Sequence, residues 1–315
     1  MASPSTGSRA GLTSTSSGRS RSGRRARART ASPRRPRSAR PPRELREAGI
    51  SARKTLGQHF LTSPRTLRRI ADAVEARPGE TVVEIGAGLG ALTEQLAERA
   101  RRVVAVELDD ALAGYLGERF AGTNVEVVHG DALELDIAKL AGGPYAVAGN
   151  LPYRIAQPLL RRLLEARPAA RRLVVMVQAE VAKSIVSKPG DASLLGVSVQ
   201  LYGEPKLLFR VPASAFYPPP KVQSAVVRVD VAPVPRAGVD DVEAFFHVAR
   251  AGFSTRRKQL RNALANGLGL DGASAGALLA QAGVEPALRA QALAVEDWAA
   301  VARAWVAAGR PGVAS

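Results

Sequence analysis

The chain has 315 residues, 46% of them hydrophobic, and no cysteine, so it can form one or two domains with a buried core but no disulfide or thiolate metal site. Its three histidines are far apart in the sequence, and we predict no metal centre. The sequence contains neither a run of about 18 apolar residues nor an N-terminal secretory signal. We therefore expect a cytoplasmic protein that does not contact membranes.

The formal net charge of +17 is concentrated near the N-terminus. Residues 1–50 contain 13 Arg and no Lys against two Glu, which leaves +11 in this segment and +6 in the rest of the chain. Because residues 1–48 hold few large apolar side chains, burial cannot offset the entropy lost on ordering them, and we predict a disordered basic tail. Three interpretations of this tail stay open: an electrostatic tether to RNA phosphates, a transit peptide, or an extension without a function.

Segments with helical and with strand-like apolar spacing alternate between residues 64 and 178. A helix is expected over 64–76, and Pro78-Gly79 ends it. Helices separate most of the strands that follow, which are expected at 81–85, 102–107, 125–129, 145–149 and 173–178. This alternation predicts a doubly wound, largely parallel sheet with helices on both faces.

The pattern changes after residue 190. Two further strands, 197–202 and 224–231, are expected to form an antiparallel pair at the sheet edge. The segment 232–239 is rich in proline and small apolar residues and is predicted to be a linker, and beyond 240 only helical spacing remains. The sequence thus predicts an α/β domain at 49–231 and a small all-α domain at 240–315.

A glycine-rich loop lies between the first of these strands and its helix. Gly86, Gly88 and Gly90 follow Glu84, and glycine lets the backbone approach a ligand because it has no Cβ. The G-x-G-x-G spacing differs from that of pyrophosphate binders, and the nearby carboxylate suits an amino-bearing ligand better than a diphosphate. The loop therefore favours a nucleoside-type cofactor. A tight strand-to-helix turn without a ligand is the alternative.

Two carboxylates end the next two strands. Glu107 stands 21 residues after Gly86, where doubly wound proteins bind ribose hydroxyls, and Asp131 is expected at the same crevice. Asp131 is placed to accept a hydrogen bond from an adenine amino group. Each residue has a simpler interpretation, as a helix cap or a solvated turn acid, but their agreement with the loop favours ligand contact.

The run Asn150-Leu151-Pro152-Tyr153 ends the fourth strand beside this crevice. An exocyclic base amine is a poor nucleophile because its lone pair is delocalised into the ring. The Asn150 carbonyl and the main-chain carbonyl of Leu151, held extended by Pro152, can accept its two N–H groups and localise the lone pair. Tyr153 offers a flat face on which a flipped base stacks. The run therefore favours methylation of a base amine over an ordinary Asn-x-Pro turn.

The chain resembles the ribosomal RNA adenine dimethyltransferases of the KsgA/RsmA family. The resemblance runs from about residue 54 to about residue 298 and includes seven motifs in order: Leu56–Leu61, Gly86–Gly90, Val106–Asp109, Gly130–Ala132, Asn150–Tyr153, Phe216–Ser224 and the basic segment Phe253–Leu264. It implies a Rossmann-like class I S-adenosylmethionine-dependent methyltransferase domain followed by a small all-α C-terminal domain. It also implies dimethylation of N6 on two adjacent adenines near the 3′ end of small-subunit (16S) rRNA during ribosome biogenesis, by an expected monomer.

The resemblance assigns roles to individual residues. It implies contacts with S-adenosylmethionine at His59, Leu61, Gly86, Gly88, Glu107, Asp131 and Asn150. Position 59 departs from the pattern, because the family usually has Asn there, although imidazole can also donate or accept a hydrogen bond. A capping residue before a helix is the simpler interpretation of His59.

Two further assignments concern the substrate. Phe216 is similar to the aromatic that stacks on the second face of the flipped adenine, and a hydrophobic plug closing the sheet is the alternative. Arg256, Arg257, Lys258 and Arg261 are expected within two turns of one helix, where RNA phosphates would offset their mutual repulsion. A solvated basic face is the alternative interpretation.

Two rival functions remain at this point. One is a large-subunit rRNA adenine N6-methyltransferase of the macrolide-resistance type, which the segments Gly57-Gln58 and Phe216–Ser224 disfavour. The other is a non-catalytic role as a ribosome-assembly checkpoint binder. The intact Gly86–Gly90 and Asn150–Tyr153 motifs instead indicate that catalysis is retained.

Overall fold

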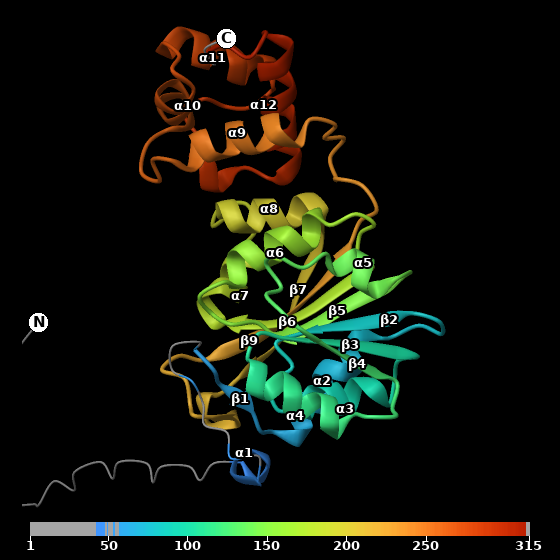
Figure 1. Ribbon diagram of the computed structural model, residues 1–315. Helices are drawn as coiled ribbons and strands as arrows, with labels where there is room; N and C mark the ends of the chain where they lie inside the picture. Colours follow the sequence, from blue (N-terminus) through green and yellow to red (C-terminus); the bar gives the residue numbers. More distant parts are fainter. Residues whose placement is uncertain (1–41, 48, 50–52, 54–56, 313–315) are drawn as a thin grey trace, which may run out of the picture. The chain divides into compact units, whose positions relative to one another are not determined.

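The computed structural model describes the whole chain except residues 1–41, 48, 50–52, 54–56 and 313–315. Its centre is a seven-stranded sheet with strand order β4-β3-β2-β5-β6-β9-β7 (Figure 1). Strands β2 to β6 pair in parallel, and β9 and β7 add an antiparallel edge. The strands are β2 (Thr81–Ile85), β3 (Arg102–Glu107), β4 (Val125–His129), β5 (Tyr145–Asn150), β6 (Arg172–Gln178), β7 (Gly203–Val211) and β9 (Ser224–Val231).

Helices cover both faces of this sheet, as the sequence predicts (Figure 1). One face carries α2 (Pro64–Val74), α3 (Ala91–Ala97) and α4 (Asp110–Arg119), and the other carries α5 (Ile137–Ala141), α6 (Ala156–Glu165), α7 (Ala179–Ile185) and α8 (Leu194–Tyr202). Successive strand residues face opposite layers: Val82 packs in the core with α2, and Val83 packs in the core with α6. The predicted Rossmann-like α/β fold is confirmed.

A second, two-stranded sheet joins two distant segments of the chain. Strand β1 (Phe60–Leu61) pairs antiparallel with β8 (Phe216–Tyr217), with Leu61 opposite Phe216. The pairing brings the first and sixth of the predicted motifs together, and a short 3₁₀ turn, Ala213–Ala215, precedes β8.

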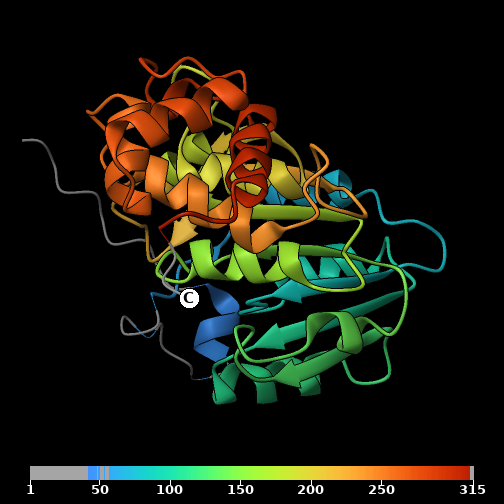
Figure 2. The ribbon, with the colours of Figure 1, turned by 90° about the horizontal axis from the view of Figure 1, so that it is seen from above.

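The C-terminal part is helical, as predicted. It contains α9 (Val242–Phe253), α10 (Leu260–Leu268), α11 (Gly272–Gln281) and α12 (Val295–Ala307), which form one group, coloured orange to red, in both ribbon views (Figure 1 and Figure 2). This group packs against α8, where the rings of Tyr202 and Phe246 lie 6.3 Å apart. The main-chain N–H groups of Gly190 and Ala192 also donate to the carbonyl of Gln291, at 2.8 and 3.1 Å.

The predicted strand over 197–202 is wrong, because these residues belong to helix α8. The Ser193 side chain accepts a hydrogen bond from the Gly196 N–H and so caps this helix. Helix α8 lies between α6 and α7 on one side and the C-terminal helices on the other. It therefore carries apolar residues on nearly every side and lacks the single apolar face of a surface helix. The strand that pairs with β9 is instead β7, at residues 203–211.

The predicted tail, 1–48, is described only in its last part. Residues 1–41 lie outside the described residues, but Arg43–Glu47 form the short helix α1. Leu45 is the large apolar side chain of this segment and is 2% exposed, packed with Phe60, Leu89 and Leu112. Burial of this one side chain accounts for a helix inside the segment that was predicted to be disordered.

Two glycine-to-alanine variants, one of them a control, test how tightly α12 packs against α9. A Cβ at Gly252 would lie 2.3 Å from the buried Trp298 ring, whereas a Cβ at Gly117 on the exposed side of α4 would meet nothing within 4 Å. We expect Gly252→Ala to lower the free energy of unfolding by about 1–3 kcal/mol through overpacking. We expect Gly117→Ala, the matched control, to raise it by about 0.5–1 kcal/mol. Urea unfolding measures both, and equal effects would contradict tight packing at Gly252.

Candidate active site

A cavity lies where the carboxyl ends of the parallel strands meet, and its volume is about 340 Å³. Ligands bind at this edge in doubly wound folds, and the volume is in the range of small-molecule sites. The structure brings ten predicted site residues to its wall, which are His59, Leu61, Gly86, Gly88, Glu107, Asp131, Asn150, Leu151, Pro152 and Tyr153. Phe216 and the four predicted RNA-binding residues do not line it.

The glycine-rich loop forms one wall of the cavity. Gly86, Gly88 and Gly90 all have positive φ, at 74, 59 and 76°, a conformation that other residues rarely adopt. At Gly90 a Cβ would lie 2.6 Å from the Phe120 ring. The loop therefore requires glycine for its own geometry, besides any close approach to a ligand.

Glu107 lies at the end of β3 and is buried. Its carboxylate accepts hydrogen bonds from the main-chain N–H of Gly88 at 2.8 Å and of Asp109 at 3.0 Å. Burial raises the pKa of Glu107, and these two hydrogen bonds oppose the shift. Each carboxylate oxygen has a second lone pair, so Glu107 can brace the glycine loop and still accept hydrogen bonds from a ligand.

Glu84 lies in the middle of the sheet, on β2, and is 1% exposed. It lines the cavity, and its Oε2 has no hydrogen-bond partner among the described residues. Burial raises the pKa of the Glu84 carboxyl to about 8, and the nearby Glu107 carboxylate adds to the shift. A buried acceptor without a partner is costly, and a cationic ligand group in the cavity would relieve this cost.

Asp131 follows the end of β4, and its placement is compatible with both interpretations that the sequence left open. Its Oδ1 accepts a hydrogen bond from the Leu133 N–H at 2.8 Å, so it caps a turn. The residue nevertheless lines the cavity, and the second carboxylate oxygen gives it an acceptor beyond the capping bond.

Asn150 is oriented by a main-chain group from the N-terminal segment. Its Nδ2 donates to the carbonyl oxygen of His59 at 2.9 Å. Since a carbonyl can only accept, the contact fixes which end of the amide points towards His59. The side-chain oxygen of Asn150 is then the end left to accept a hydrogen bond from a ligand. The Leu151 N–H donates to Met176 at 3.1 Å, so strand pairing continues one residue past Asn150.

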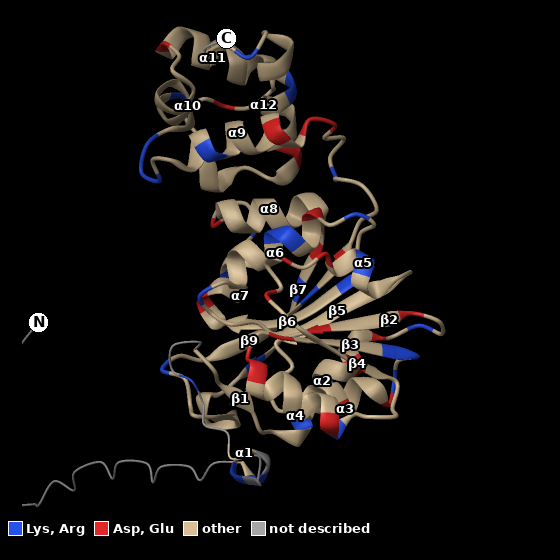
Figure 3. Cartoon of the chain, viewed as in Figure 1, with Lys and Arg blue, Asp and Glu red and all other residues tan. Residues whose placement is uncertain are grey.

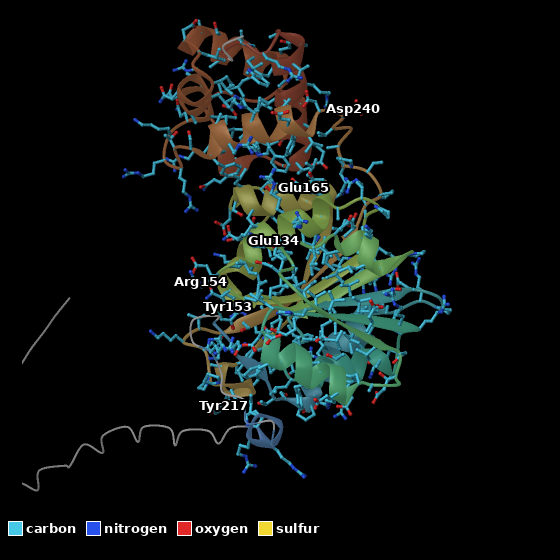
Figure 4. All side chains as sticks on the ribbon, viewed as in Figure 1. Glu134, Tyr153, Arg154, Glu165, Tyr217 and Asp240 are labelled. Carbon is cyan, nitrogen blue, oxygen red and sulfur yellow. The ribbon has the colours of Figure 1, made fainter. Side chains whose placement is uncertain are left out.

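Tyr153 lies in the turn between β5 and α6 (Figure 4). Its ring and the His59 ring are stacked, with centroids 5.9 Å apart and an interplanar angle of 28°. The Tyr153 hydroxyl shares a hydrogen bond of 2.6 Å with Ser224 Oγ. His59 Nδ1 lies 2.7 Å from the carbonyl oxygen of Pro218, which requires that this nitrogen carry the proton.

Phe216 is placed differently from the sequence prediction. It is 2% exposed and packs in the core with Leu61, Leu67 and Val226. This placement matches the alternative interpretation, a hydrophobic plug that closes the sheet. In this conformation its ring does not reach the cavity that Tyr153 lines.

The predicted basic helix is wrong in detail. Helix α9 ends at Phe253 and α10 begins at Leu260, so Arg256, Arg257 and Lys258 lie on the turn between them. These three side chains and that of Arg261, in the first turn of α10, are exposed. Figure 3 shows the basic turn on the C-terminal helical group.

Sequence reasoning missed two residues of the site. Ser224 and Pro218 contact Tyr153 and His59 from the Phe216–Ser224 segment, which was assigned a role only through Phe216. A second polar group, Asp109, is buried and accepts from Gln58 at 3.3 Å and pairs with Arg53 at 3.1 Å, so it holds the segment before β1 against α4. Ser224 and Asp109 are polar residues inside two of the motifs, and this was the signal by which the sequence could have pointed to them.

Among the described residues, no group of His, Asp or Glu side chains could hold a metal ion. No helix in the described part of the chain is long and apolar enough to cross a membrane.

Comparison with known proteins gives a consistent result. The family model described as "Ribosomal RNA adenine dimethylase" matches residues 49–305. The chain is 50% identical over 256 residues to "Ribosomal RNA small subunit methyltransferase A" of Dehalococcoides mccartyi (strain ATCC BAA-2266 / KCTC 15142 / 195), covering 79% of this chain and 87% of the relative. It is 44% identical to the protein of that name from Pelotomaculum thermopropionicum, covering 84% and 95% of the two chains.

Solved structures agree with these sequence matches. A dimethyladenosine transferase from Plasmodium falciparum has a TM-score of 0.69 at 25% identity, covering 79% of this chain and 98% of that chain. The 23S rRNA methyltransferase ErmE has a TM-score of 0.64 at 30% identity, covering 78% and 98%.

The buried carboxyl of Glu84 makes stability depend on pH. Its pKa is about 8 in the folded chain against an ordinary value of 4.5, so the protonated group favours the folded state at low pH, and this contribution is lost as pH rises from about 4.5 to about 8. Glutamine does not ionise, so the stability of Glu84→Gln does not fall in this way over the same pH range. We expect its thermal midpoint to rise relative to the parent protein between pH 5 and pH 8. The control Glu118→Gln changes an exposed carboxylate, and a difference for Glu84→Gln that does not vary with pH would contradict the raised pKa.

Proposed function

The chain belongs to the ribosomal RNA adenine dimethylase family, and we propose that it uses S-adenosylmethionine to dimethylate N6 of two adjacent adenines near the 3′ end of small-subunit (16S) rRNA. The observation that carries the proposal is the Asn150 amide, held by the His59 carbonyl at the wall of a cavity that Tyr153 also lines. The relatives named as small-subunit enzymes, at 43–50% identity, support the choice of substrate.

The residues around the cavity fit S-adenosylmethionine. The unpartnered Oε2 of Glu84 is a buried acceptor for the α-ammonium group of the methionine part. Glu107 would accept hydrogen bonds from the two ribose hydroxyls, Asp131 would accept from the adenine amino group, and Gly86 and Gly88 would lie against the ligand. His59, Leu61 and Asn150 would complete the contacts. The cofactor supplies an electrophilic methyl group on a sulfonium sulfur.

The protein's own contribution is to prepare the amine. The Asn150 side-chain oxygen and the Leu151 main-chain carbonyl would accept the two N–H groups of N6, and Pro152 restricts the backbone at Leu151. Acceptors on both N–H groups localise the nitrogen lone pair, and fixed dipoles need no reorganisation during the reaction. No strong base is required, because the amine proton becomes acidic only as the methyl group arrives.

Tyr153 would stack on the flipped adenine. Burial raises the pKa of its phenol, with the hydrogen bond to Ser224 opposing the shift. The phenol therefore stays protonated near neutral pH, and its role is to hold the base rather than to remove a proton. Phe216 could stack on the second face of the adenine only if its buried ring moved out of the core.

The RNA contact extends to the C-terminal helical part, residues 240–315. The exposed cations of the α9–α10 turn, Arg256, Arg257 and Lys258, together with Arg261, would bind phosphates of the ribosomal RNA. Phosphate contacts of this kind position the substrate without reading its sequence. We further propose that the enzyme acts as a monomer in the cytoplasm, where small subunits are assembled.

The alternative substrate is large-subunit rRNA, since ErmE shares the fold and 30% identity. The higher identity to the small-subunit relatives favours the small subunit. A checkpoint role in ribosome assembly is compatible with catalysis, because binding the subunit and methylating it use the same contacts.

Methylation of ribosomal RNA tests the proposal directly. Purified protein is incubated with S-adenosylmethionine and either unmethylated small subunits or large subunits, and the digested RNA is analysed by mass spectrometry. We expect two N6,N6-dimethyladenosines per small subunit. Absence of this nucleoside, or its formation only in large-subunit RNA, would refute the proposed function.

Asn150→Ala removes one acceptor for the amine. Loss of one fixed dipole at a reaction centre lowers turnover by about 10²–10³-fold, so we expect methyl transfer to fall by at least that order. Affinity for S-adenosylhomocysteine, measured by calorimetry, should change by less than about tenfold, since Glu84 and Glu107 remain. Asn150→Asp is the companion variant: it keeps an acceptor but places oxygen against the His59 carbonyl, so it also loses activity. Full turnover by Asn150→Ala would contradict the role.

A further inference from the structure

Ser224 is a fully buried serine at the start of strand β9. Strand β9 lies between β6 and β7, and Ser224 is opposite Gln178 on one side and Val211 on the other. The next residue towards the N-terminus is also fixed, because the Gln223 carbonyl accepts from the Ala179 N–H at 2.9 Å. The main chain at Ser224 is therefore held by two neighbouring strands.

Tyr153, the partner of this hydroxyl, has no such support from the sheet. It lies in the turn that begins after Leu151 and ends at Ile155, where α6 follows. The hydrogen bond of 2.6 Å between the Tyr153 hydroxyl and Ser224 Oγ connects the end of this side chain to the sheet. The hydroxyl oxygen lies on the long axis of the side chain, so this bond fixes where the tip of the ring lies and restricts rotation about χ1.

The segment that contains Ser224 makes a second contact of the same kind. The Pro218 carbonyl holds the His59 imidazole at 2.7 Å, and that ring is stacked with Tyr153. None of the residues from 216 to 224 lines the cavity itself. The segment therefore reaches the cavity through two side chains that belong to other motifs.

We propose that Ser224 is a positioning residue for methyl transfer, which fixes the position of the Tyr153 ring on which the target adenine stacks. This inference rests on the proposed function and assigns the Phe216–Ser224 segment a task other than direct stacking. The reason is geometric: Phe216 is buried in the core, whereas Ser224 contacts the ring that faces the cavity. A ring held in place loses less freedom when the base binds, so the correct stack forms more often.

A double-mutant cycle with Ser224→Ala and Tyr153→Phe tests the proposal. Each variant removes one end of the same hydrogen bond, and Tyr153→Phe keeps the stacking ring. We expect each to lower kcat/KM for small subunits by about threefold to tenfold, the range of one net hydrogen bond. Because both act through one contact, the double variant should differ from either single variant by less than about twofold.

A matched control and two further measurements distinguish this positioning role of Ser224 from a merely structural one. Ser198→Ala in α8 is the matched control, since its hydroxyl bonds to the Leu194 carbonyl at 2.6 Å and it does not line the cavity. We expect it to leave kcat/KM unchanged. We also expect Ser224→Ala to leave S-adenosylhomocysteine affinity unchanged in calorimetry, and Tyr153→Phe to keep the pH profile of the parent enzyme.

Three outcomes would overturn the proposal. They are unchanged kcat/KM in Ser224→Ala, losses that multiply in the double variant, or a loss of cofactor affinity that accounts for the whole effect. Thermal midpoints of all variants are measured alongside, and assays are run well below the lowest midpoint so that unfolding does not enter. Failure of the parent protein to methylate small subunits refutes the proposed function instead, because the cycle presupposes an active parent.

Discussion

The close approach of β2 and β5 at their carboxyl ends is the constraint on which the site depends. A Cβ at Gly149 would lie 2.5 Å from the Ile85 carbonyl oxygen, so only glycine lets the two strands pair there. Next along each strand come Gly86, at the start of the glycine-rich loop, and Asn150, at the start of the Asn150–Tyr153 run. A side chain at 149 would push these two segments apart. The distance between these two walls of the cavity is therefore set by backbone packing, and under the proposed function it would set the distance between the methyl donor and its acceptor.

Charge is divided between the inside and the outside of the molecule in a way that suits two ligands of opposite sign. The cavity holds the buried carboxyl groups of Glu84 and Glu107, both with a raised pKa because of burial. The exposed α9–α10 turn instead carries the cations Arg256, Arg257 and Lys258. Under the proposed function, a cationic cofactor and a polyanionic RNA would each meet a surface of complementary charge.

Much of this arrangement could be predicted from the sequence, and the failures have physical causes. The positions of the parallel strands along the chain and the position of Asn150 follow from apolar spacing and glycine placement, which are local properties. The helix at 194–202 was mistaken for a strand because an element buried on all sides loses its periodicity. The contact of Asn150 with the His59 carbonyl joins residues 91 positions apart, and main-chain acceptors leave no trace in the sequence. Burial of Phe216 depends on its pairing with Leu61, which is equally non-local.

The burial of α8 has a consequence for how the protein is made. The outer side of this helix is covered by α9 and α12, which begin 40 and 93 residues after α8 ends. During synthesis the sheet and its flanking helices emerge first, so an apolar helix stays uncovered until the C-terminal helices leave the ribosome. Exposed apolar surface of this kind promotes aggregation. Folding of the nascent chain therefore competes with aggregation in the interval before its last helices dock.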